Sequence, residues 1–115
     1  MLNFKDYESI IQERVAKIKD DNWKWSVKEI TEDTVKIQWG YLTDLGEPND
    51  CFSILRREDE TCDPGEYWIV ARDSFHNLIE GYTVAEQVTK SWQSTIINGI
   101  IMLIEDIADY AHERY

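Results

Sequence analysis

The spacing of apolar residues changes abruptly after residue 20, and this change constrains the fold more than any other feature. In residues 4–19 apolar side chains recur every three or four positions, which predicts an amphipathic helix. In residues 23–28 and 35–41 they recur at every second position, which predicts two half-buried strands. A helix therefore precedes a hairpin with one aromatic face, which we expect to lie in the core. That face carries Trp23, Trp25 and Trp39.

Two more strands are predicted, over residues 51–58 and 67–72, and Pro64-Gly65 marks a turn between them. Residues 73–82 fit a loop, a short helix or a fifth strand equally well. Thr83 and Glu86 have the spacing of a helix capping box, so the C-terminal helical region should begin there. It forms one long helix, or two shorter ones if the poor helix formers of residues 91–95 break it.

These elements predict an α+β fold with an N-terminal helix, an antiparallel sheet of about four strands, and one long or two shorter C-terminal helices. The 115 residues match the usual size of one domain, so we expect a single domain, 1–115. The charged N-terminal segment contains no signal-peptide pattern, and no apolar run is long enough to cross a membrane. We therefore expect a cytoplasmic protein whose two cysteines, Cys51 and Cys62, are reduced.

The C-terminal helix is apolar around most of its circumference. Two neighbouring stripes begin at Ile96 and Ile97 and continue to Ala111 and Ala108. Such a helix must be covered on more than one side. One interpretation is a central helix packed between the sheet and the N-terminal helix. The other is that part of it forms a homodimer surface, with Gly99 allowing a second backbone to approach closely.

The formal net charge is −11, and it is concentrated in the second half of the chain. Residues 1–57 contain nine basic and eleven acidic side chains, whereas residues 58–115 contain three basic and twelve acidic ones. The acidic side chains form two clusters, one in the loops around the third strand and one on the last helix. We predict that both bind a partner: Asp44, Glu47, Asp50, Glu58, Asp59, Glu60, Asp63 and Glu66, and then Glu105, Asp106, Asp109 and Glu113.

Catalytic and metal-binding patterns are weak. His76 and Glu80 lie four residues apart, but the chain has two histidines and no HExxH motif. An Asp-rich start at residue 59 resembles a calcium loop, yet Pro64 stands where that loop requires glycine. We therefore predict no catalytic residues, no cofactor and no metal. One interpretation remains open, a small enzyme or ligand-binding domain with a pocket near His76 or His112.

The acidic balance excludes the classes of protein that grip phosphates directly, because such binding relies on Lys and Arg. We expect no direct binding of nucleic acid and no membrane binding, but a basic partner, which negative surfaces attract and select. At the level of class, a compact acidic α+β protein is similar to inhibitors made by phages and mobile elements, including anti-CRISPR and other anti-defence proteins, several of which mimic nucleic acid. The resemblance implies a host enzyme as target. The alternative is an immunity or antitoxin protein that neutralises a basic nuclease toxin.

Overall fold

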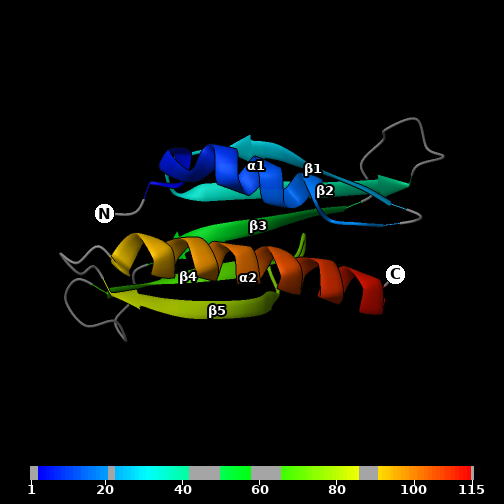
Figure 1. Ribbon diagram of the computed structural model, residues 1–115. Helices are drawn as coiled ribbons and strands as arrows, with labels where there is room; N and C mark the ends of the chain where they lie inside the picture. Colours follow the sequence, from blue (N-terminus) through cyan, green and yellow to red (C-terminus); the bar gives the residue numbers. More distant parts are fainter. Residues whose placement is uncertain (1–2, 21–22, 42–49, 58–65, 86–90, 115) are drawn as a thin grey trace.

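The computed structural model describes residues 3–20, 23–41, 50–57, 66–85 and 91–114. Two helical elements, five strands and a long helix follow one another along the chain (Figure 1). In order they are the 3₁₀ turn η1 (Phe4–Tyr7), α1 (Glu8–Ala16), β1 (Trp23–Ile30), β2 (Thr34–Tyr41), β3 (Asp50–Arg57), β4 (Glu66–Arg72), β5 (Leu78–Ala85) and α2 (Ser91–Arg114). None of the helices in these ranges combines the length and the apolar run needed to cross a bilayer.

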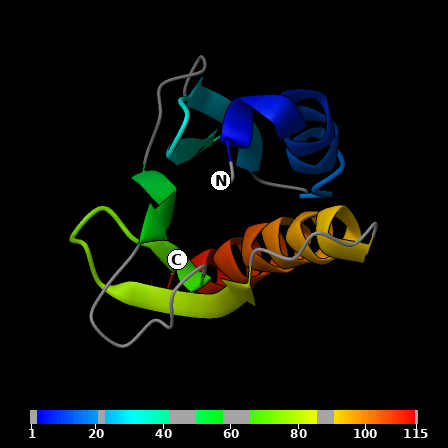
Figure 2. The same ribbon diagram turned by 90° about the vertical axis from the view of Figure 1, so that its left-hand side faces the viewer.

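The five strands form one antiparallel sheet in the order β1-β2-β3-β4-β5, so each strand pairs with its neighbour in sequence. Both helices cover the same face of this sheet, α1 against β1 and α2 against β4 and β5 (Figures 1 and 2). The α+β prediction is thus confirmed, with five strands in place of about four. The additional strand, β5, comes from the segment whose pattern was ambiguous.

The predicted start of the C-terminal helix is wrong. Thr83, Val84 and Ala85 belong to β5, where they pair with the beginning of β4. Thr83 and Val84 are β-branched and suit a strand, so pairing with β4 overrides the local capping pattern. The helix begins at Ser91 and continues without interruption to Arg114, so the break considered within residues 91–95 does not occur.

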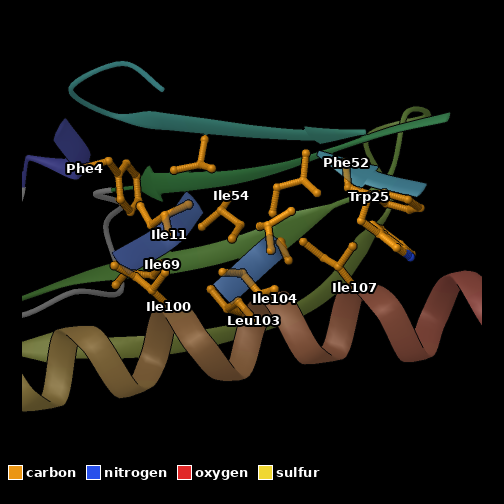
Figure 3. Close-up of a cluster of buried hydrophobic side chains, with 14 of the residues drawn as sticks. Phe4, Ile11, Trp25, Phe52, Ile54, Ile69, Ile100, Leu103, Ile104 and Ile107 are labelled. Carbon is orange, nitrogen blue, oxygen red and sulfur yellow. The ribbon is translucent and has the colours of Figure 1, made fainter. Parts of the chain in front are cut away.

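The hydrophobic core fills the space between the sheet and the two helices (Figure 3). The predicted aromatic face is confirmed, because Trp23 and Trp25 are 7% exposed and Trp39 is fully buried. The rings of Trp23 and Trp39 stack with their centroids 4.2 Å apart, and Phe52 of β3 extends the cluster. This cluster fixes the register of β1 against β2, since a slip of one residue would turn its side chains outward.

The packing of α2 explains its two apolar stripes. The first stripe faces the sheet, and its members Ile100, Leu103 and Ile107 are buried. In the second stripe, Ile104 is buried as well, while Ile101 lines a shallow hollow toward α1. The sheet therefore covers α2 on one side, and α1 flanks it on another. Because α1 packs beside α2 on the same sheet face, the prediction that α2 lies between the sheet and the N-terminal helix is wrong. The homodimer stays a prediction.

Candidate protein-binding surface

The structure describes only two of the eight residues of the loop cluster. Six of its members lie outside the described residues: Asp44, Glu47, Glu58, Asp59, Glu60 and Asp63. The backbones of the other two are placed, with Asp50 at the start of β3 and Glu66 at the start of β4. Asp50 pairs with Trp39 at one end of the sheet, whereas Glu66 pairs with Ala85 at the other end. Since β3 alone is roughly 23 Å long, these two residues do not belong to one patch.

The second cluster is fully described and forms a continuous row along the C-terminal half of α2. We name Glu105, Asp106, Asp109 and Glu113 the α2 carboxylate row. Glu105, Asp109 and Glu113 follow one another at four-residue steps on the solvent side of the helix, and all three are exposed. Asp106 lies beside them and is half-buried.

Cations neutralise little of this row. Arg14 of α1 reaches Glu105, with Nη2 3.0 Å from Oε1, and both side chains remain well exposed. Asp109 and Glu113 make no ion pair with any other residue that the structure describes. The row therefore keeps most of its negative charge at the surface.

Asp106 connects the row to the sheet. The Tyr82 hydroxyl of β5 donates a hydrogen bond of 3.0 Å to Asp106 Oδ2. Burial raises the pKa of Asp106 above its usual value, and the nearby carboxylates of Glu80, Asp109 and Glu105 raise it further. Burial, together with the bond to Asp106, likewise raises the pKa of Tyr82. The bond from Tyr82 lowers the pKa of Asp106, but burial and the three neighbouring carboxylates outweigh it.

Glu80 also belongs to this acidic surface, which the sequence did not predict. It is exposed on β5, next to the row, and its carboxylate accepts a hydrogen bond from the Gly81 amide. The segment around it carried no clear period, so nothing local indicated that it faces α2. Only the pairing of β5 with β4 brings Glu80 close to Asp106.

The end of α2 is anchored to the start of β1 by a separate polar contact. His112 Nε2 lies 3.0 Å from Asp20 Oδ2, and the imidazole stacks on the Trp23 ring at 4.5 Å. The same Asp20 carboxylate accepts hydrogen bonds from Trp25 Nε1 and from the Trp23 amide. His112 is thus engaged in holding the helix to the sheet. The same contact places the end of α2 at the Asp50 end of the sheet, away from Glu66.

Among the described residues, neither histidine of the enzyme or ligand-binding interpretation lines a hollow. Two shallow hollows lie between α1 and α2, and neither His76 nor His112 lines them. Within the described ranges, no group of three or more His, Cys, Asp and Glu side chains is arranged to hold a metal ion. His76 lies instead on an exposed turn, four residues before Glu80.

Comparison with known proteins identifies no family and no relative for this chain. No protein-family model matches the chain, and neither a curated protein nor a solved structure matches it significantly. The functional argument therefore depends on the residues themselves.

Proposed function

We propose that this protein is an inhibitor that binds a basic, nucleic-acid-handling host protein and occupies the surface on which that protein holds phosphates. The observation that carries the proposal is the α2 carboxylate row, exposed and mostly without cationic partners among the described residues. On this proposal the protein is a nucleic-acid mimic of the anti-defence type, such as an anti-CRISPR protein, encoded by a phage or a mobile element.

The spacing of the row suits this role. Its four carboxylates occupy nine residues, or about 12 Å of helix axis, which is one charge per about 4 Å. One strand of B-DNA carries one phosphate per about 3.4 Å. Lys and Arg side chains arranged to bind such a strand would meet a similar density of negative charge along α2. Because α2 is a packed helix, the charges are held in place before binding.

The row also opposes the stability of its own helix. Glu113 lies in the last turn of α2, where an exposed carboxylate interacts unfavourably with the helix dipole by about 0.3–1 kcal/mol. The pairs Glu105–Asp109 and Asp109–Glu113 add like-charge repulsion at i, i+4. Retaining four carboxylates in this position is understandable if a basic partner neutralises them.

Affinity capture with matched variants tests the proposal. The wild-type protein, the triple variant Glu105→Gln/Asp109→Asn/Glu113→Gln and the control Glu8→Gln/Glu29→Gln/Glu32→Gln are immobilised and exposed to nuclease-treated lysate of the host cell. Each variant removes three exposed carboxylates, but the control leaves α2 intact. Asp106 is kept because it bonds to Tyr82.

We expect the wild type and the control to retain a nucleic-acid-handling protein, and the α2 variant to retain at least about tenfold less of it. If both triple variants lose retention equally, net charge matters and the position of the row does not. If both retain the partner as well as the wild type does, the row does not bind it. A retained nuclease toxin, encoded next to this protein, would instead identify an immunity protein.

A further inference from the structure

A tight turn between β4 and β5 projects from the same region as the α2 carboxylate row. Its base is Asp73, which is 7% exposed and accepts four hydrogen bonds. Asp73 Oδ1 accepts from the amides of Phe75 and Asn77, at 2.9 and 2.8 Å. Asp73 Oδ2 accepts from Asn77 Nδ2 and from the Tyr110 hydroxyl of α2, at 3.2 and 2.8 Å. Residues 73–77 are therefore fixed to each other and to α2.

The backbone of this turn is strained and held in place. His76 has a φ of 67°, in the left-handed region that residues other than glycine rarely adopt. Arg72 Nη1 donates a hydrogen bond of 2.8 Å to the His76 carbonyl and so holds the strained residue. Burial by itself would raise the pKa of Asp73, but the bonds from Tyr110, Asn77 and Phe75 hold that pKa below its usual value. Strain of this kind persists only where several contacts enforce it, and it is enriched at functional sites.

The fixed turn and the first residue of β5 each present a large apolar side chain to solvent. Phe75 is 78% exposed and Leu78 is 59% exposed, the highest values among the large apolar side chains that the structure describes. Single exposed apolar residues are common on protein surfaces. Two of them beside one fixed backbone turn are different, because a backbone that is ordered before binding loses less entropy when its side chains enter a pocket.

The turn is continuous with the acidic surface. The Asp73–Tyr110 bond attaches its base to α2 beside Asp109, and the Tyr82–Asp106 bond attaches the following strand one helical turn earlier. Glu80 lies between these two bonds, close enough to raise the pKa of Asp106. Asp109 and Glu80 therefore lie near the base of the turn.

We propose that residues 73–77 and Leu78 form a preorganised anchor, which inserts Phe75 and Leu78 into an apolar pocket bordered by Lys or Arg side chains on the protein partner. This inference rests on the proposed function, because the carboxylates beside the turn define the basic border of the pocket. The row supplies attraction at a distance, and the anchor supplies contact area once the two proteins meet.

The test compares Phe75→Ala with the triple α2 variant Glu105→Gln/Asp109→Asn/Glu113→Gln, using full-length protein and the partner that the wild type captures. Affinity is measured at several salt concentrations, and the control is Met102→Ala, which removes a 46% exposed apolar side chain from α2. We expect Phe75→Ala to weaken binding at least about tenfold with an unchanged salt dependence, and Met102→Ala to change the affinity less than twofold. The thermal unfolding midpoint of Phe75→Ala should equal that of the wild type, because the side chain is exposed.

The possible results separate the two proposals. If Phe75→Ala binds like the wild type while the triple variant fails, the anchor is overturned and the proposed function stands. If Phe75→Ala fails while the triple variant binds normally, the turn contacts the partner, but the proposed function and the basic border of the pocket are overturned. If the wild type dimerises in sedimentation and Phe75→Ala is monomeric, a second copy of the chain occupies the turn, and the anchor for a basic partner is overturned. A wild type that captures nothing overturns both.

Discussion

At the scale of single residues, Asp106 shows most clearly that the acidic surface opposes folding. Its pKa is raised by burial and by neighbouring carboxylates, so the folded state disfavours its ionised form. The stability that this residue contributes is present below the unfolded pKa of about 3.9. That contribution is lost as the pH rises through the higher pKa of the folded state. Near neutral pH an ionised Asp106 therefore lowers the free energy of unfolding.

Asp106→Asn tests this point. We expect the variant to raise the free energy of unfolding by about 0.5 kcal/mol at neutral pH, because it removes a half-buried charge that lies among other carboxylates. The amide oxygen can still accept the hydrogen bond from Tyr82. The difference should disappear in acid, where Asp106 is protonated. Urea unfolding at both pH values measures it, and a variant that is less stable at neutral pH would show that the Tyr82 bond to the charged form dominates.

The role of a single residue could be predicted from the sequence only where the residue belongs to a local repeating pattern. Trp23, Trp25 and Trp39 alternate with polar residues, so their burial followed from period alone. Asp73 and Glu80 lie in a segment without a clear period. Their partners on α2 come 37 and 26 positions later in the chain, so no local rule connects them.

At the scale of elements, β5 and the start of α2 mark the limit of reasoning from the sequence. The capping-box spacing at Thr83 satisfies a local rule for helix initiation. The same residues complete the hydrogen bonding of β4, which would otherwise be an edge strand, and this non-local pairing decides their structure. The predicted helices and strands before residue 73 agree with the structure to within a few residues, apart from the shorter extent of α1.

Gly99 gives a prediction about α2 as an element. The homodimer interpretation places a second backbone beside it, and in the described part of the chain nothing other than its own helix lies within 4 Å of the position that its Cβ would take. Gly99→Ala should therefore raise the free energy of unfolding by about 1 kcal/mol through helix propensity alone. The control Gly81→Ala should gain nothing, because its Cβ would lie 3.1 Å from Val70 Cγ1.

Thermal unfolding of both glycine variants measures this difference. A Gly99→Ala variant that is less stable than the wild type would indicate a close neighbour outside the described residues, such as a second copy of the chain. Sedimentation at high concentration would then decide whether the homodimer exists.

At the scale of the whole molecule, the fold places Asp50 and Glu66, two members of the loop cluster, at opposite ends of the sheet. Composition already predicted a basic partner, and that inference needs no structure. Composition could not show that the two described members of the loop cluster lie at opposite ends of the sheet. It also could not show that Glu80 and the turn carrying Phe75 adjoin the α2 carboxylate row. These relations depend on strand order and helix placement, which a charge count does not contain.

The central claim is that the α2 carboxylate row takes the place of nucleic acid on its partner. The most direct test is to titrate duplex DNA into the complex of this protein with the partner that it captures, at low and at moderate salt. We predict mutually exclusive binding, with the complex released by DNA and weakened by salt, and a salt dependence that becomes flatter in the variant Glu105→Gln/Asp109→Asn/Glu113→Gln. A ternary complex that holds both DNA and this protein would contradict the account.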